Sequence, residues 1–236
     1  MYALVLAGGK GERLRPYTDN RPKPMVEIGD KPILAYQIEW LQREGITDII
    51  LLCGYRHEVI RDYFGDGQKW GLHIDYLIED EPLGRGGAFK QGFEKLPPTE
   101  SLVIATNGDV ITAQPLQPLI EAHQAQGALA TIMLTPFVSP YGIVNVAEDN
   151  RVTGFEEKPK LPYWINAGVY VFSTDCRHHL PDKGDHEDST FPELARRGQL
   201  GAFKSSAFWR AIDTVKDLSD ATRELAEHPP SGSATQ

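Results

Sequence analysis

Short apolar runs alternate with amphipathic segments over the first two thirds of this chain, and this alternation constrains the fold more than any other feature. The runs at residues 48–53 (DIILLC) and 102–106 (LVIAT) are typical of strands that are buried on both faces. Similar strand patterns cover residues 2–7, 74–78 and 128–134, and helical patterns cover residues 32–44, 58–64, 87–96 and 116–126. Strands and helices alternating at this spacing form βαβ units with right-handed crossovers. The pattern therefore predicts an α/β fold with a single Rossmann-like, mostly parallel sheet and helices on both faces.

The pattern changes after Gly142. Residues 142–159 read as two strands around an Asp149–Asn150 turn, which is a hairpin signal. The remaining patterns are a strand and two helices, at residues 164–172, 191–197 and 215–227. We expect this part to form a smaller, mixed or antiparallel subregion that carries the substrate. No linker divides the chain, so residues 1–227 are predicted to form one domain.

Composition restricts the partners. The chain has 236 residues, 41% of them hydrophobic, and a net charge of -9. A chain without a global basic surface is not expected to bind nucleic acid or an anionic membrane. The sequence contains no run of about 18 apolar residues that would predict a membrane span. The N-terminus does not resemble a signal peptide. We therefore expect a cytoplasmic protein. The polar residues 228–236 are expected to form a disordered or loosely packed tail.

A glycine-rich, basic loop follows the first strand. Residues 4–25 read LVLAGGKGERLRPYTDNRPKPM. The Walker pattern is absent, and the dinucleotide pattern fails because Leu14 replaces its last glycine and Pro16 follows. Glycines alone would also suit a simple tight turn. The nearby Arg13, Arg15 and Lys23 instead favour a loop that binds the phosphates of a nucleoside triphosphate, because backbone N–H groups and guanidinium groups both bind phosphate oxygens.

This loop resembles the signature of the sugar-1-phosphate nucleotidyltransferases, at residues 6–16 and again at residues 22–25 (PKPM). Five further motifs follow in that family's order: EPLGRGGA at 81–88, NGD at 107–109, YG at 141–142, EKP at 157–159 and NAGVYVF at 166–172. Together the matches cover residues 2 to 218. The resemblance implies an enzyme that transfers a nucleoside monophosphate from a nucleoside triphosphate to a sugar 1-phosphate and releases pyrophosphate.

The resemblance also implies residue roles. Arg13 would hold the β- and γ-phosphates, Lys23 would lie beside the α-phosphate, and Lys158 would bind the phosphate of the sugar. The nucleotide would be bound by Leu6, Ala7, Gly8, Gly9, Gly11, Glu81, Gly86, Asn107 and Gly108. The sugar would be bound by Gly142, Glu157, Lys158, Asn166 and Gly168.

Two carboxylates are predicted to bind Mg²⁺. Asp109 follows a strand at the edge of the sheet where parallel α/β folds bind ligands, and Mg²⁺ is bound by one or two carboxylates together with phosphate oxygens and water. Many relatives carry a second aspartate at the position of Ala211. Residues two apart on a strand share a face, so Asp213 is the predicted second ligand, with Asp217 as a weaker candidate.

The substrates stay open at this level. The carboxylate of Glu81 could accept from two N–H groups of guanine or from one of uracil, and the motifs resemble guanylyl-, uridylyl- and cytidylyltransferases. We expect GTP with a mannose- or heptose-type 1-phosphate, with UTP or CTP as alternatives. A non-catalytic regulatory subunit on the same fold is a further alternative, and a homo-oligomer is left open. His178, His179 and His186 are interpreted as solvated loop histidines.

Overall fold

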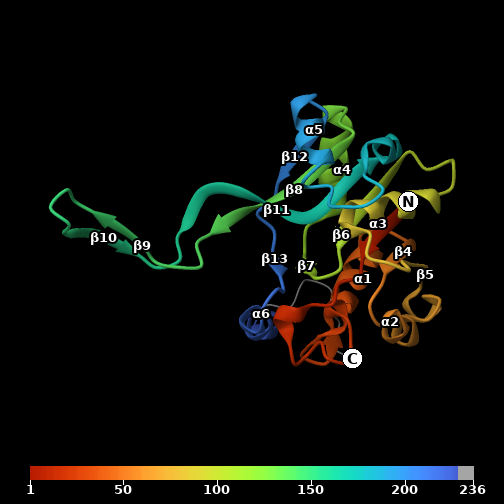
Figure 1. Ribbon diagram of the computed structural model, residues 1–236, viewed down its shortest axis with the longest axis horizontal. Coiled ribbons are helices and arrows are strands. Elements are labelled where there is room, and N and C mark those ends of the chain that lie inside the picture. Colours follow the sequence, from red (N-terminus) through yellow and green to blue (C-terminus); the bar gives the residue numbers. More distant parts are fainter. Residues whose placement is uncertain (228–236) are drawn as a thin grey trace.

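A seven-stranded sheet forms the centre of the computed structural model, which describes residues 1–227. Its strand order is β12-β8-β11-β6-β1-β4-β5 (Figure 1). The strands span β1 Tyr2–Leu6, β4 Asp48–Cys53, β5 His73–Ile78, β6 Leu102–Asn107, β8 Ala130–Val138, β11 Lys160–Ser173 and β12 Leu200–Lys204. Strands β6, β1, β4 and β5 are parallel neighbours, and β11 runs antiparallel to β6 and β8. The predicted α/β fold with a mostly parallel sheet is confirmed.

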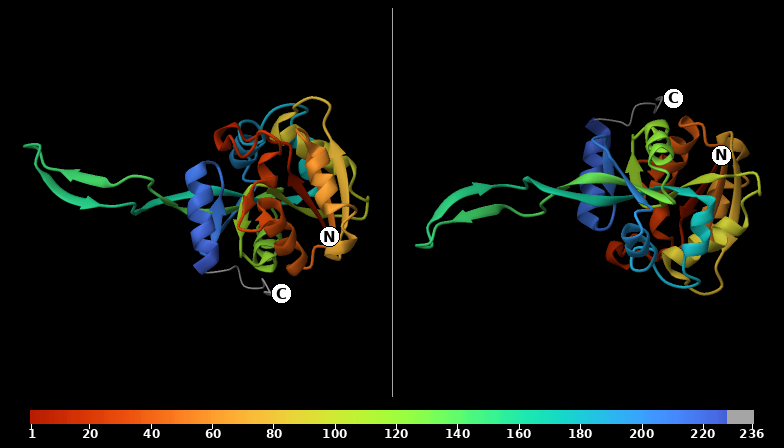
Figure 2. Two further views of the ribbon diagram at one scale, coloured as in Figure 1. Left: turned by 90° about the horizontal axis from the view of Figure 1, so that it is seen from below. Right: turned by 90° about the horizontal axis from the view of Figure 1, so that it is seen from above.

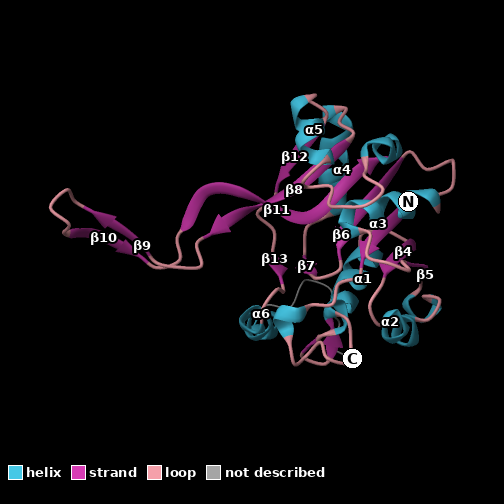
Figure 3. Ribbon diagram, in the orientation of Figure 1, coloured by secondary structure: helices cyan, strands magenta, loops and turns pink. Residues whose placement is uncertain are grey.

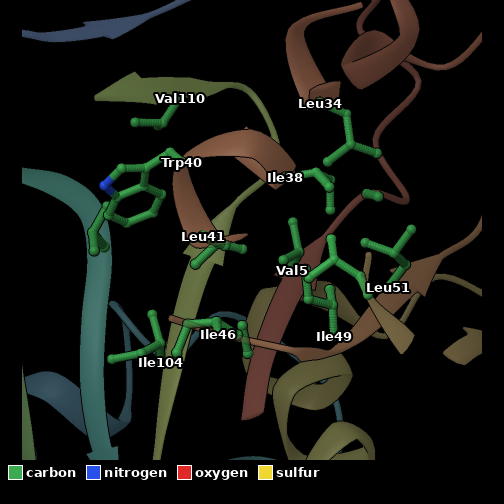
Figure 4. Packing of buried hydrophobic residues seen from close by; sticks show 14 of the residues in the cluster. Val5, Leu34, Ile38, Trp40, Leu41, Ile46, Ile49, Leu51, Ile104 and Val110 are labelled. Carbon is green, nitrogen blue, oxygen red and sulfur yellow. The ribbon is translucent and has the colours of Figure 1, made fainter. Parts of the chain in front are cut away.

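Helices cover both faces of this sheet (Figure 3). The longer helices are α1 Ile33–Arg43, α2 His57–Phe64, α3 Gly84–Glu94, α4 Leu116–Gln126, α5 Thr190–Arg196 and α6 Val215–Glu227. Alternate residues of each central strand point to opposite faces. Val5 and Leu51 pack with α1, α2 and α4 in one cluster, whereas Leu4 and Leu52 pack with α3 and α5 in the other. Figure 4 shows the first cluster, with Trp40 and Leu41 of α1 lying over the strands.

Small antiparallel sheets complete the body. They consist of β2 Glu27–Ile28 with β3 Lys31–Pro32, and of β7 Val110–Thr112 with β13 Trp209–Ala211. Short 3₁₀ turns occur at Glu12–Leu14, Lys23–Met25, Gln68–Trp70 and Thr174–His179. A third apolar cluster packs α6 against the segment that follows β1. As a result, the end of the chain that carries Asp213 is fixed beside the N-terminal loop.

The predicted hairpin forms, but it leaves the body of the protein. Strands β9 Ile143–Val146 and β10 Val152–Glu156 pair around the Asn150 turn, where φ is 64°. Both views of Figure 2 show this two-stranded arm extending away from the sheet on the ends of β8 and β11. Its side chains are exposed, with Phe155 67% and Tyr141 77% accessible. The predicted tail at residues 228–236 lies outside the described residues.

Candidate active site

A large pocket opens at the carboxyl ends of β1, β4 and β6, the edge at which parallel α/β sheets bind ligands. Its volume is about 1260 Å³, which is ample for a nucleotide together with a sugar phosphate. The lining combines the glycine loop, the start of α3, the end of β6, the middle of β11 and the segment after β13. Segments from both ends of the described chain therefore meet here.

Glycines shape the loop that borders this pocket. Gly11 has φ 68°, and a Cβ there would lie 2.7 Å from the Cβ of Lys23. The Lys23 N–H donates to the carbonyl of Gly9 at 3.3 Å. At Gly108, a Cβ would lie 2.4 Å from the carbonyl oxygen of Leu6, which accepts the Gly108 N–H at 2.8 Å. Close backbone contacts that exclude side chains thus hold Lys23 against the loop.

Lys23 lies between two carboxylates inside the pocket. Its Nζ donates to Asp109 Oδ2 at 2.5 Å and to Asp213 Oδ1 at 2.7 Å. Arg13 Nη2 also donates to Asp213 Oδ1, at 2.8 Å. Burial lowers the pKa of Lys23, but the two carboxylates outweigh this effect and raise it above its ordinary value. For Asp213, burial raises the pKa, while Lys23 and Arg13 outweigh burial and lower it. Both groups are therefore charged near neutral pH.

Local hydrogen bonds fix Asp213 in this position. The Ile212 N–H donates to the carbonyl of Asp109 at 3.0 Å, which continues the pairing of β13 with β7. Asp217 Oδ2 accepts from the N–H of Asp213 at 3.2 Å and from that of Thr214 at 2.8 Å. The Thr214 hydroxyl in turn accepts from the Asp217 N–H at 3.2 Å. This reciprocal arrangement is a capping box at the start of α6, so Asp217 orients the segment that holds Asp213.

The residues present fit a Mg²⁺ ion. Asp109 and Asp213 each reach the same nitrogen of Lys23, so their carboxylates are close enough to share one cation. Within residues 1–227, no three His, Cys, Asp or Glu side chains gather into a complete metal site. An ion here would take its other ligands from phosphate oxygens and water, as Mg²⁺ commonly does.

Most predicted site residues line the pocket, and five do not. Those in the lining are Leu6, Gly8, Gly9, Gly11, Arg13, Lys23, Glu81, Asn107, Gly108, Asp109, Asn166, Gly168 and Asp213. Those outside it are Ala7, Gly86, Gly142, Glu157 and Lys158. Ala7 is completely buried. A Cβ at Gly142 would lie 3.0 Å from Glu157 Oε2, so the base of the arm keeps these two residues together, away from the pocket lining.

Sequence reasoning missed Glu79, which also lines the pocket. Its Oε2 accepts the Leu83 N–H at 3.1 Å, and its Oε1 lies over the backbone of Gly8 and Gly54. Glu81, the predicted base-binding carboxylate, instead lies at the rim with its side chain 71% accessible and its Oε2 2.8 Å from Lys183 Nζ. The two glutamates stand two residues apart in one acidic run, and the sequence offers no signal that separates them.

His186 corrects one interpretation of the sequence. It is completely buried, whereas we expected a solvated histidine. Its ring packs against Phe89, Tyr170 and Phe191, with ring centroids 5.3, 5.3 and 4.7 Å away. Burial lowers its pKa to about 3, so the ring is neutral. Phe89 and Tyr170 come from α3 and β11, which are distant in sequence, and this is why a local pattern does not reveal the environment.

Comparisons with known proteins agree with this architecture. A mostly parallel sheet with a glycine-rich loop and paired aspartates at its carboxyl edge places the chain among the α/β proteins that bind ligands at that edge. The chain belongs to the nucleotidyl transferase family, whose model matches residues 2–228. The predicted membership among the sugar-1-phosphate nucleotidyltransferases is thereby confirmed.

Individual relatives share most of this chain. The mannose-1-phosphate guanyltransferase of Saccharomyces cerevisiae is 36% identical over 247 residues, covering 100% of this chain and 68% of the yeast protein. That of Neurospora crassa is 37% identical over 230 residues, covering 94% of this chain and 63% of the fungal protein. Among solved structures, HddC from Yersinia pseudotuberculosis complexed with GMP-PN superposes with a TM-score of 0.76 at 29% identity, covering 95% of this chain and 99% of HddC. Among the described helices, none is long and apolar enough to cross a membrane.

Proposed function

We propose that this chain transfers a nucleoside monophosphate from a nucleoside triphosphate to a sugar 1-phosphate. A phosphate oxygen of the sugar 1-phosphate forms a bond to the α-phosphorus, the bond from that phosphorus to the β-phosphate bridging oxygen breaks, and pyrophosphate leaves. Both reactants are anions that repel each other, so catalysis depends on positioning and on stabilising negative charge. The observation that carries the proposal is the Lys23 ammonium between Asp109 and Asp213 at the edge of a large pocket.

Each charged residue has a place in this reaction. Lys23 can exchange a carboxylate for an oxygen of the α-phosphate, where charge develops as the sugar phosphate attacks. Arg13 is 71% accessible and adjacent to the same carboxylate, so its guanidinium can bind the β- and γ-phosphates and stabilise the departing pyrophosphate. Asp109 and Asp213 would hold Mg²⁺, which when bound neutralises phosphate charge. The glycines of the loop let the phosphates approach backbone N–H groups.

We propose Glu79, in place of Glu81, as the carboxylate that reads the base. Glu79 lies in the pocket beside Gly8, where the loop backbone would meet the nucleotide, whereas Glu81 is paired with Lys183 at the rim. Guanine presents two adjacent N–H donors on one edge, and a carboxylate can accept both. Two findings support guanine: the curated relatives are named mannose-1-phosphate guanyltransferases, and the HddC structure contains GMP-PN. We therefore propose GTP and a mannose- or heptose-type 1-phosphate as substrates.

Lys158 remains a proposed ligand of the sugar phosphate. It lies at the base of the arm with φ 49° and is exposed. Because it is outside the pocket lining in this structure, the role requires the arm base to approach the pocket when substrates bind. Lys158→Ala should then raise KM for the sugar 1-phosphate and leave KM for GTP unchanged, whereas Lys160→Ala, at the start of β11, should change neither.

The direct test is pyrophosphate release. The protein is incubated with Mg²⁺ and each of the common nucleoside triphosphates against mannose, heptose, glucose and N-acetylmuramic acid 1-phosphates. The proposal predicts pyrophosphate and a nucleoside diphosphate sugar in equal amounts, with the highest rate for GTP. No pyrophosphate with any pair would refute transfer, and a higher rate with UTP or CTP would refute the base assignment alone.

A further inference from the structure

Arg85 presents a fixed guanidinium to the pocket at the start of α3. Its Nη2 donates to Asp185 Oδ2 at 2.7 Å, and its Nη1 lies 2.7 Å from Glu187 Oε1. The Arg85 N–H also donates to Asp185 Oδ1 at 2.8 Å. All three residues line the pocket, and the Arg85 side chain remains 46% accessible. Two carboxylates therefore hold the guanidinium in one orientation, while part of it can still meet a ligand.

Glycines attach the loop carrying Asp185 and Glu187 to α3. A Cβ at Gly86 would lie 2.9 Å from the Gly184 carbonyl oxygen, and a Cβ at Gly87 would lie 2.6 Å from that of Asp182. The Gly86 N–H donates to the Gly184 carbonyl at 2.9 Å. Only glycine, which has no Cβ, fits these contacts. The loop and the helix therefore pack closely and together form one wall of the pocket.

A buried histidine backs this wall. His186 Nδ1 lies 3.2 Å from Glu187 Oε2. In the described part of the chain, neither His186 ring nitrogen nor Glu187 Oε2 has a well-formed hydrogen bond, although all three atoms are shielded from solvent. Unsatisfied polar groups in a core cost free energy. A cluster that retains them beside a binding pocket is not explained by stability.

This wall adjoins the proposed sugar side of the pocket. Asn166 Nδ2 donates to the Tyr170 hydroxyl at 2.9 Å. Burial raises the pKa of that hydroxyl, with Glu187 adding to the rise and Arg85 opposing it. Asn166 of β11 and Arg85 of α3 both line the pocket.

From these contacts we propose that Arg85 is a specificity-determining residue that donates hydrogen bonds to hydroxyl groups of the sugar, with Asp185 and Glu187 as its positioning residues. This inference rests on the proposed function, since it names what the same site selects. Arg85 carries one positive charge and its partners carry two negative ones when ionised. The cluster therefore cannot attract an anion as Arg13 and Lys23 do, and it favours a neutral, hydroxyl-rich sugar over one that bears a carboxylate.

The test uses binding, so that it does not depend on turnover. Calorimetry compares mannose 1-phosphate with mannuronic acid 1-phosphate, which differ only at C6. In the first arm, Arg85→Leu should weaken the affinity for mannose 1-phosphate by about tenfold or more, the loss expected for a charged donor, and leave the affinity for GTP within about twofold. Arg85→Lys should restore only part of the loss, because a lysine cannot reproduce the fork of the guanidinium.

In the second arm, the positioning residues are neutralised together as Asp185→Asn with Glu187→Gln. Arg85 then keeps its charge without compensation, so the affinity for mannuronic acid 1-phosphate should rise about fivefold or more relative to that for mannose 1-phosphate. The matched control is Lys90→Ala, which removes the 2.6 Å ion pair between Lys90 and Asp182. That pair joins the same helix to the same loop outside the pocket, so this variant should leave both affinities unchanged.

The outcomes separate this inference from the proposed function. Unchanged sugar affinity in Arg85→Leu, or an unchanged ratio of the two sugars in the double variant, would overturn the inference. Equal losses for GTP and the sugar would assign Arg85 a merely structural role and also overturn it. A wild-type protein that binds both substrates but releases no pyrophosphate would refute the proposed function, while the affinity ratios would still decide the inference.

Discussion

The ammonium of Lys23 lies 2.5 Å from Asp109 and 2.7 Å from Asp213, so one cation joins two carboxylates that are about a hundred positions apart in the sequence. Its side chain is only 12% accessible. Two carboxylates this close would repel each other without the cation. Lys23 therefore balances the charge of the two carboxylates, and we propose that the phosphate under attack binds beside it.

Replacing Lys23 with methionine should separate metal binding from turnover. Lys23→Met leaves two carboxylates without a cation, so the protein should bind Mg²⁺ more tightly and be stabilised more by it in thermal unfolding. Nucleotidyl transfer should nevertheless fall by roughly 100-fold or more, as for loss of a donor that stabilises developing charge. Titration calorimetry with Mg²⁺ and pyrophosphate release measure the two effects.

The control for this variant is Arg21→Met. Arg21 lies two residues before Lys23 and outside the main pocket, where it forms a 2.8 Å ion pair with Glu27. The Arg21→Met variant should alter neither Mg²⁺ affinity nor turnover. Weaker Mg²⁺ binding in Lys23→Met would contradict the placement of the ion between Asp109 and Asp213.

The capping box at α6 should affect both stability and catalysis. Asp217→Ala removes the acceptor for the N–H groups of Asp213 and Thr214, and the loss of such a cap costs about 1 kcal/mol. Because Asp213 then loses its fixed orientation, kcat should fall by about tenfold. Denaturant unfolding and pyrophosphate release test this pair of effects. The matched variant Asp220→Ala, on the same helix, should leave kcat unchanged, and an equally active Asp217→Ala would show that the cap does not position Asp213.

Base preference should follow Glu79 and not Glu81. A glutamine presents one acceptor and one donor, which suits uracil or thymine better than the two donors of guanine. In Glu79→Gln, kcat/KM for GTP should therefore fall about tenfold or more, and the ratio of kcat/KM for UTP to kcat/KM for GTP should rise. Glu81→Gln loses only a rim ion pair with Lys183, so it should behave like wild type. The reverse result would return the base-reading role to Glu81.

Burial of His186 should make the free energy of unfolding depend on pH. Its pKa is lowered from the ordinary 6.5 to about 3, chiefly by burial, with Arg85 lowering it further and Asp185 opposing. Between pH 6.5 and 3 the unfolded chain binds a proton that the folded chain does not, so the free energy of unfolding falls as pH falls. At pH 5 this difference in proton binding lowers the free energy of unfolding by about 2 kcal/mol relative to pH values above 6.5.

The variant His186→Phe keeps an aromatic ring among Phe89, Tyr170 and Phe191 and removes the titration. The difference in unfolding free energy between pH 7 and pH 5 should therefore shrink by about that amount relative to wild type. His178→Gln changes an exposed histidine and should leave the difference as it is. An unchanged pH dependence in His186→Phe would mean that the ring is not held neutral.

The central alternation of strands and helices was predictable because its signal is local. Helix α4 (Leu116–Gln126) and strand β4 (Asp48–Cys53) occupy the predicted residues. Helix α3 begins at Gly84, three residues before the prediction, because its glycines resemble a loop until one sees that they pack against the segment around Gly184. Strand β12 (Leu200–Lys204) was not predicted, since it is a short edge strand with only one buried residue.

Site residues were predictable from the sequence where they belong to a motif that fixes the local backbone conformation. Gly11, Lys23 and Asp109 belong to such motifs, and all three line the pocket. The sequence does not single out Glu79 and Arg85, because their proposed roles depend on which side chain points into the pocket and on the loop after residue 181. Pairings of that kind join residues about a hundred positions apart, such as Arg85 with Asp185, and no local pattern reports them.

Product formation from GTP and mannose 1-phosphate with Mg²⁺ tests most directly whether this pocket joins a nucleotide to a sugar phosphate. Wild-type protein and Asp109→Asn are compared by chromatography of the nucleotides and by pyrophosphate assay. We expect wild-type protein to form GDP-mannose and pyrophosphate in equal amounts, and Asp109→Asn to be slower by roughly 100-fold or more. Equal rates for the two proteins, or pyrophosphate without a nucleoside diphosphate sugar, would contradict this expectation.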